Sequence, residues 1–337
     1  MDIDIKKKEI WVDNVKVIAC VFVVLGHFFQ SMVKAQILPG NDLFQWFNQT
    51  IYFFHVPLFF ISSGFLYQKF TLVSNIKMWG KNIFKKGFIL GIPYIVFSTL
   101  TWGLKFLFPT EINSKVTHGI VDTLLFHPIS PYWYLYTLIL IFIVTPTFIN
   151  RYTAIIGLVL AILFKCLAIY GVFRDEYIIS TLFTNEIWFV LGMCFCICGI
   201  RSTGKIWIFL CCFFCVAFFI ASVIIYQMRI ENEWIFFGMG VLACVGIIGF
   251  TIAMSSDRKQ NKYFFFLSKY SMPIYLMHTL FTAPLRIILL KLGIANAFIH
   301  ILVGIAISFL GSITVAKIMK KIKWVEFILY PGKFIKM

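Results

Sequence analysis

The chain has 337 residues, of which 61% are hydrophobic and 13% charged, and its mean hydropathy is +0.90. Soluble domains carry about 25% charged residues, so this composition excludes a soluble globular protein. The formal net charge of +16 is compatible with a nucleic-acid partner. The basic residues lie between apolar runs, however, which favours membrane topology as their cause. We therefore expect membrane lipid, and no nucleic acid, as a partner.

Apolar runs of about 18 to 22 residues recur along the chain, and each is long enough to cross a hydrocarbon core of ~30 Å as a helix. We predict an all-α, polytopic transmembrane helical bundle of about ten spans. Residues 1–337 are expected to form a single domain, because no soluble domain, internal repeat or low-complexity linker divides them. The approximate spans are 14–33, 46–67, 85–107, 132–149, 152–172, 178–199, 206–226, 234–254, 272–290 and 296–317.

The loop charges predict the orientation of these spans. With a cytoplasmic N-terminus, 21 of the 30 basic residues fall on the cytoplasmic side, five on the other side, and four within or at the edges of spans. The positive-inside rule then places both termini in the cytoplasm, which requires an even number of spans. On the external side, Trp133 and Tyr134 are candidates for stacking on a sugar ring, although interfacial aromatic residues also serve as simple anchors.

Several ionisable residues lie inside the predicted spans, where insertion costs about 2.5–3.5 kcal/mol near the centre. For Lys165 and Arg286 a structural role, by snorkelling or pairing, is the favoured interpretation. For Glu186 and His278 a structural role and a substrate-binding role are both open. The remaining members of this set are Lys16, His27 and His55.

Lys16 and His27 are eleven residues apart, which is close to three full helical turns. Both side chains are therefore expected on one helix face, about 16 Å apart along the axis. An imidazole is a suitable general base because its usual pKa is near neutrality, and a cation on the cytoplasmic side could attract an anionic co-substrate. The structural alternative is a snorkelling lysine and a histidine bonded between helices.

His55 lies about nine residues into the second span, which runs back from the external side. His27 and His55 are expected to differ in depth by about 4–5 Å, so their imidazoles could meet. Pro57 predicts a kink just after His55. The following Ser62, Ser63 and Gly64 indicate close packing of helices.

A basic stripe precedes the third span. Lys81 and Lys85 continue an i, i+4 series that starts at Lys77, and Lys86 widens it. If this segment is helical, the lysines form a cytoplasmic ridge suited to phosphate groups. A positive-inside anchor is the competing explanation.

Five segments together resemble the acyltransferase 3 family of membrane acyltransferases, occur in the family's order and cover nearly the whole chain. The family's Arg/Lys-x10-His pattern is similar to Lys16–His27. The other segments are FFHVPLFFISSGFLY at 53–67, SPYWYL at 130–135, WFVLGMCF at 188–195 and LSKYSMPIYLMH at 267–278.

The resemblance implies a ten-helix domain that passes acyl groups, usually acetyl from acetyl-CoA, to an extracytoplasmic acceptor such as a cell-envelope polysaccharide. It makes His27 the catalytic candidate. Arginine is common in the family where Lys16 stands, and arginine is also frequent near the third span, where this chain has lysines. Some relatives carry a fused extracytoplasmic esterase-like domain. We expect none in this chain, so any such transferase would be a separate partner.

We therefore expect an acyl-CoA-dependent O-acyltransferase of the cell membrane, multi-pass and bacterial, with acetyl-CoA as co-substrate and no metal. The expected acceptor is a hydroxyl of an envelope glycan or a lipid-linked sugar. His27 would act as general base or as acyl carrier, assisted by His55 and with Lys16 at the cytoplasmic approach. The alternatives are acylation of a small molecule or lipid, and a transporter that exports a polysaccharide or lipid-linked sugar, since intramembrane ionisable residues also mark transport paths.

Overall fold

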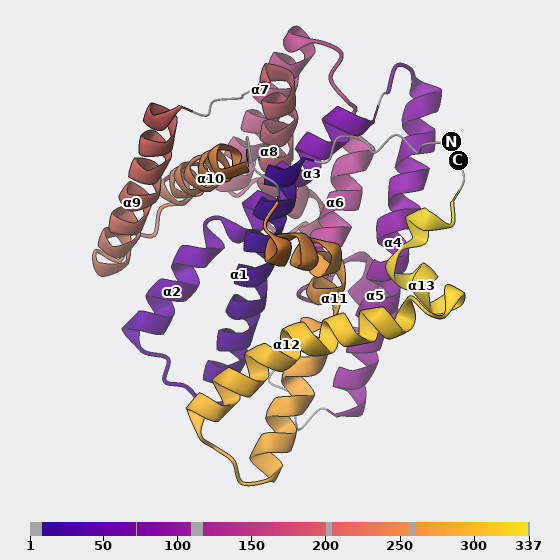
Figure 1. Ribbon diagram of the computed structural model, residues 1–337. Helices are drawn as coiled ribbons and strands as arrows, with labels where there is room; N and C mark the ends of the chain where they lie inside the picture. Colours follow the sequence, from indigo (N-terminus) through magenta and orange to yellow (C-terminus); the bar gives the residue numbers. More distant parts are fainter. Residues whose placement is uncertain (1–8, 72, 109–116, 200–203, 256–259, 336–337) are drawn as a thin grey trace.

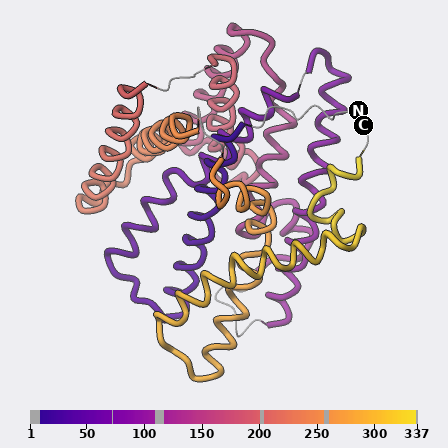
Figure 2. The backbone as a smooth tube through the Cα atoms, in the orientation of Figure 1, coloured from indigo at the N-terminus to yellow at the C-terminus, as the bar shows by residue number. Residues whose placement is uncertain are grey.

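The computed structural model describes residues 9–71, 73–108, 117–199, 204–255 and 260–335 (Figures 1 and 2). Within these ranges the fold is all-helical, with no β-strand. The α-helices are α1 (Ile10–Lys34), α2 (Asp42–Tyr52), α3 (His55–Phe70), α4 (Ile76–Leu107), α5 (Ile120–Leu125), α6 (Trp133–Val144), α7 (Arg151–Ile169), α8 (Tyr177–Cys198), α9 (Lys205–Gln227), α10 (Glu233–Ser255), α11 (Lys262–Lys291), α12 (Ala297–Met319) and α13 (Lys323–Leu329), followed by a 3-10 turn, Pro331–Lys333.

Nine helical segments in the described part of the chain are long and apolar enough to cross a membrane, and α2 with α3 counts as one of them. They match nine of the ten expected spans. The tenth, expected at 132–149, contains only the 12-residue helix α6, whose length of about 18 Å is less than the hydrocarbon thickness. The helix ends early because Pro146 disfavours helical geometry at the preceding residue, Thr145, which is extended.

A glutamine of α3 makes two hydrogen bonds to the backbone of the irregular segment after α6. The Gln68 side-chain amide donates to the Phe148 carbonyl (2.8 Å), and the Phe148 N–H donates to the Gln68 amide oxygen (2.9 Å). Exposed peptide groups are costly in lipid, so this two-way bond permits a non-helical segment at this position.

The predicted kink of the second span lies before His55, not after it. The helix is interrupted at Phe53 and Phe54, between α2 and α3. Proline has no N–H to bond the carbonyl four residues earlier, which for Pro57 is that of Phe53. The interruption therefore falls on the N-terminal side of the proline, and His55 begins the new helix α3.

Close packing of α3 against α8 confirms the prediction made from the small residues in the second span. Gly64 lies against the Phe189 carbonyl, and Gly192 lies against the Ile61 carbonyl; a Cβ at either glycine would collide with that backbone. Reciprocal glycine contacts of this kind allow helix backbones to approach closely in membrane proteins.

Helix α1 lies in the middle of the assembly and packs against α3, α10 and α11 (Figure 1). It is antiparallel to α3, because Trp11 contacts Phe65 while Phe22 contacts Phe54. It is parallel to α11, as four successive contacts show. These pairs are Asn14–Gln260, Cys20–Ser271, His27–His278 and Ser31–Arg286.

Candidate active site

Two histidines from different helices meet inside the bundle. The ring of His27 on α1 lies 5.4 Å from the ring of His278 on α11, centroid to centroid, with the planes tilted by 37°. The parallel packing of the two helices places these residues at the same depth. His278 is 1% exposed, whereas His27 is half-buried and faces a cavity.

The hydrogen bonds of His278 define its tautomer. Its Nδ1 lies 3.0 Å from the Ile274 carbonyl oxygen and 2.9 Å from that of Tyr275. A carbonyl oxygen can only accept, so Nδ1 carries the proton, and in the neutral ring Nε2 retains its lone pair. Within the described residues this buried Nε2 has no hydrogen-bond partner. His278 therefore offers a basic nitrogen beside His27.

His55 also has its proton on Nδ1. Its Nδ1 donates to the Ile51 carbonyl at 2.6 Å, and its ring packs at 4.7 Å, edge to face, on Tyr52. The Tyr52 hydroxyl in turn accepts a bond from Gln30 on α1 (2.8 Å). His55 and His278 both lie close enough to His27 to act on its charge. His55 therefore lies near His27, as the sequence predicted, and His278 lies there as well, which the sequence did not predict.

A cavity of about 530 Å³ opens from His27 toward the ends of α1, α4 and α11. Its polar lining includes Gln30, Ser31 and Thr101, and it also has four cationic residues, Lys34, Lys105, Arg286 and Lys291. The apolar part of the wall consists of Leu104, Phe108, Leu280, Ala283, Pro284, Ile287 and Ile288. The His27 imidazole is therefore accessible from this side of the protein.

Lys16 lies toward the opposite end of α1, on the helix face predicted from its spacing to His27. Its charge interacts with those of Asp13 and Lys86. The ammonium group of Lys86 lies over the rings of Phe142 (5.2 Å) and Tyr67 (6.0 Å). The two lysines form a basic pair at the cytoplasmic end predicted from the loop charges.

The lysines of the predicted ridge differ in exposure. All four are on α4, as expected; Lys77 and Lys81 are exposed, whereas Lys85 and Lys86 are half-buried. Among the described contacts, Lys86 is the ridge lysine that packs on aromatic rings, and its charge acts on that of Lys16.

The predicted substrate-binding residues of α6 and α8 are in the helix core rather than in the cavity wall. The Tyr134 ring is buried, and its hydroxyl lies 3.0 Å from Ser63 Oγ. Glu186 is buried and accepts a bond from Thr145 at 2.9 Å. Trp133 is half-buried and packs against the core. Their roles in substrate binding stay predictions.

The structure gives Arg286 a position that the sequence did not favour. This side chain is 3% exposed, lines the cavity and donates from Nη1 to the hydroxyl (2.5 Å) and carbonyl (3.3 Å) of Ser31. Its eight-residue separation from His278 was the available signal, since it places both on α11 a little over two turns apart.

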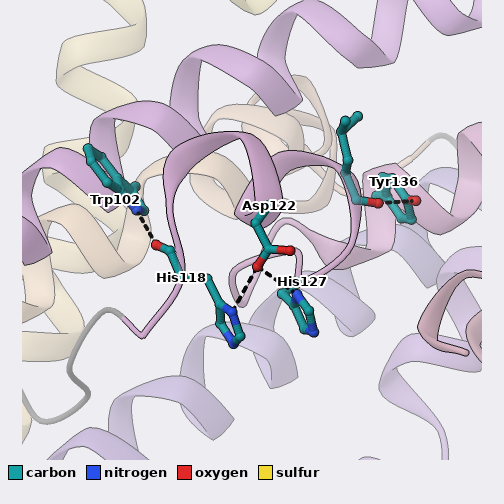
Figure 3. A network of polar contacts seen from close by, with 6 residues as sticks. Trp102, His118, Asp122, His127 and Tyr136 are labelled. Atoms are coloured by element: carbon teal, nitrogen blue, oxygen red, sulfur yellow. Dashed lines mark hydrogen bonds and ion pairs between the residues drawn. The ribbon is translucent and has the colours of Figure 1, made fainter. Parts of the chain in front are cut away.

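A polar cluster lies on the segment between α4 and α6 (Figure 3). Asp122 Oδ2 accepts from His118 Nδ1 (2.8 Å) and His127 Nδ1 (2.9 Å), and the two rings stack at 4.1 Å. Trp102 of α4 donates to the His118 carbonyl at 3.0 Å. The three side chains are close enough to hold a metal ion. They are substantially exposed, and the contacts to Asp122 join a residue before α5 to a residue after it.

Comparison with known proteins agrees with the motif pattern. A family model described as an acyltransferase domain matches residues 9–317. The chain belongs to the acyltransferase 3 family. It is also similar to the nodulation protein NolL of Mesorhizobium japonicum, with 29% identity over 144 residues, which cover 40% of this chain and 35% of that protein. The match therefore spans little more than a third of that relative's length. No solved structure matches the chain.

The long apolar helices and the histidines inside the bundle are both consistent with membership of the acyltransferase 3 family. The chain combines the acyltransferase domain of this family with the long apolar helices of a multi-pass membrane protein. Family membership favours acyl transfer to oxygen over the transporter alternative. The Lys16–His27 pattern, the first of the five segments that resemble the family, lies on α1. This helix runs from the Lys16–Lys86 pair to the accessible imidazole of His27.

Proposed function

We propose that this acyltransferase moves an acetyl group from acetyl-CoA, supplied from the cytoplasm, to a hydroxyl of an extracytoplasmic or lipid-linked envelope polysaccharide. The hydroxyl oxygen forms a bond to the acetyl carbon, and the carbon–sulfur bond breaks. The hydroxyl proton passes to an imidazole, and the sulfur leaves as the CoA thiolate and is protonated. The products are the acetyl ester and free CoA.

The observation that carries the proposal is the pairing of His27 with His278 at the inner end of a cavity. His27 is half-buried and borders the cavity, so it can contact an acceptor hydroxyl. A positioned imidazole contributes about 10²–10⁴-fold to such a reaction when it takes the proton in the transition state. His278 supplies a second neutral imidazole, whose fixed Nδ1–H leaves Nε2 basic. We assign proton removal to His27 and its support to His278 and His55.

The basic pair at the other end of α1 supports the acyl-CoA assignment. Ammonium groups bind phosphate as point charges, and Lys16 lies with Lys86 on the side where the positive-inside rule places the cytoplasm. Lys81 and Lys85, nearer the start of α4, extend the positive charge toward that surface. An anionic donor attracted there would approach His27 from the side opposite the cavity.

The side on which the cavity opens supports an extracytoplasmic acceptor. Helices α1 and α11 run parallel, and α4 shares their direction, because Lys86 neighbours Lys16 while Lys105 neighbours Lys34. With the N-terminus in the cytoplasm, all three helices end on the external face. His27 would then receive the donor from within and the acceptor from outside.

The proposal is tested in two steps. Purified protein in nanodiscs is given acetyl-CoA with and without isolated envelope glycans or lipid-linked sugars, and free CoA thiol is measured together with acetylated product. Mass spectrometry then compares envelope glycans from cells with and without the protein. We expect acceptor-dependent CoA release and loss of acetyl esters when the protein is absent. An unchanged acetylation pattern, with no CoA release for any acceptor, would refute the proposal.

A further inference from the structure

Four cationic side chains line the cavity beyond His27. They come from three helices, and no acidic residue is among the described residues of the lining. Lys34 is at the end of α1, Lys105 near the end of α4, and Arg286 and Lys291 are on the last part of α11. The charges of Lys34 and Lys105 are close enough to repel each other. Such a set is electrostatically suited to an anion.

The positive-inside rule does not explain this concentration of charge. Of the 30 basic residues, only five fall on the external side and four within or at the edges of spans. Two of those five, Lys34 and Lys291, and two of those four, Lys105 and Arg286, line this one cavity. Basic residues are usually depleted on the external side, so this rule does not account for their convergence here.

Arg286 is the most buried of the four cations. Its side chain is almost completely buried, and the two bonds to Ser31 fix the position of the guanidinium group at the cavity wall. A guanidinium has five N–H donors in a rigid fork, which matches the geometry of a phosphate. Charged residues at membrane depth are expensive and mark functional sites by default.

The lining also has a continuous apolar component. Leu104, Phe108 and Ile287 lie among the cations, and the remaining apolar residues of the wall come from the same stretch of α11. A small inorganic anion would not use this surface. An amphiphile would use both parts, with its charged group among the cations and its apolar part along the wall.

The distance between the cations and the imidazole restricts the acceptor further. Lys34 is seven residues beyond His27 on α1, and Arg286 is eight residues beyond His278 on α11. At 1.5 Å per residue the cations lie about 10–12 Å along the axis from the histidine pair. A ligand bound by its anionic group would therefore present to His27 a hydroxyl at about that distance from the charge.

We propose that the acceptor is a phosphate-bearing amphiphile, such as a sugar linked to a lipid through a phosphate or diphosphate. Arg286, Lys105 and Lys34 hold its phosphate, and the sugar hydroxyl reaches His27. This inference rests on the proposed function, because it identifies the chemical class of the acceptor in that same site. The same phosphate chemistry could be supplied by the headgroup of an anionic membrane lipid, so the test separates the two sources.

The test measures binding, which does not require turnover. Purified full-length protein is placed in phosphatidylcholine nanodiscs and titrated with octyl phosphate or with octyl glucoside, which has the same chain but no charge. We expect octyl phosphate to bind more tightly, and Arg286→Gln and the double variant Lys34→Gln/Lys105→Gln to weaken it about tenfold or more, because charged hydrogen bonds contribute about 1.5–3 kcal/mol. The double variant changes more exposed residues, so it tests the inference even if Arg286→Gln fails to fold.

Lys165→Gln is the matched control, because this lysine is a buried cation on α7 outside the cavity wall. It should bind octyl phosphate as the unmodified protein does. Equal affinity for the two octyl compounds, or an equal loss in the Lys165 variant, would overturn the inference. So would complete competition by phosphatidylglycerol in the nanodisc, which would make the cavity a site for bulk lipid.

The same variants separate this inference from the proposed function. His27→Gln should reduce acetyl transfer about 10²–10⁴-fold and leave octyl phosphate binding in place. If phosphate binding is lost in the cavity variants but neutral acceptors are acetylated at the original rate, the phosphate assignment is wrong and the acyltransferase assignment stands.

Discussion

His27 and His278 are 251 positions apart in the chain, yet their rings lie 5.4 Å apart between two parallel helices. The carbonyls of Ile274 and Tyr275 accept from Nδ1 of His278 and so fix the free lone pair on its Nε2. A substitution of His278 can therefore keep the donor at the Nδ1 position while it removes the basic Nε2.

His278→Asn should reduce acetyl transfer about 10- to 100-fold with little loss of stability. The asparagine amide can still donate to the backbone carbonyls in place of Nδ1, but no basic nitrogen replaces Nε2. The expected loss is smaller than the roughly 10²–10⁴-fold of a direct general base, because His278 supports His27 and does not take the proton itself. Transfer rates and thermal unfolding of the purified variant check this. A rate equal to that of the unmodified protein would show that His278 only packs.

Lys86→Gln should raise the KM for acetyl-CoA about 3- to 10-fold and leave kcat nearly unchanged. Removal of one charge from the basic pair weakens donor attraction in both ground and transition states, which appears as uniform binding. The effect should shrink at high salt. Lys321→Gln is the control, because Lys321 is exposed after α12. If both variants changed KM equally, a specific donor role for Lys86 would be excluded.

Gly64→Ala should destabilise the protein by about 2 kcal/mol or more, because the new methyl group would overlap the Phe189 carbonyl and force α3 from α8. Gly80→Ala provides the opposite case. Gly80 is an exposed position inside α4 with nothing within 4 Å of a built Cβ, so alanine should be neutral or stabilise by up to about 1 kcal/mol. Unfolding of both variants in one detergent measures the difference. Equal stabilities would contradict the close α3–α8 contact.

Asp122→Asn should change stability by less than about 1 kcal/mol and leave acetyl transfer unchanged. Asp122 loses its charge opposite His118 and His127, but all three side chains are substantially exposed, and exposed ion pairs contribute little. Unfolding and activity assays check this. A loss of activity reversed by added zinc would show instead that the cluster is a functional metal site.

The sequence predicted most of the helices because lipid requires long apolar runs, and these are visible without a structure. The predicted helix ends were less accurate where a proline interrupts the helix at the residues that precede it. The break at Phe53–Phe54 precedes Pro57, and α6 ends before Pro146. In both places the proline removes or displaces a helix bond on its N-terminal side.

Part of the site was also predictable. Helical spacing placed Lys16 and His27 on one helix face, and depth along two antiparallel spans brought His55 near His27. The sequence could not predict the cationic cavity. Its cations Lys34, Lys105, Arg286 and Lys291 come from three helices, and only the packing of α1, α4 and α11 shows that they converge. Each alone resembled an interfacial anchor.

The most direct test of the central claim is acetyl transfer by purified His27→Gln protein, compared with His300→Gln. His300 is a buried histidine of α12 whose Nε2 lies 2.8 Å from the Ile294 carbonyl, outside the cavity lining. If His27 removes the acceptor proton, His27→Gln should lose about 10²–10⁴-fold in CoA release and product formation, while its unfolding temperature stays close to that of the unmodified protein and His300→Gln remains active. Transfer by folded His27→Gln at the original rate would contradict the account.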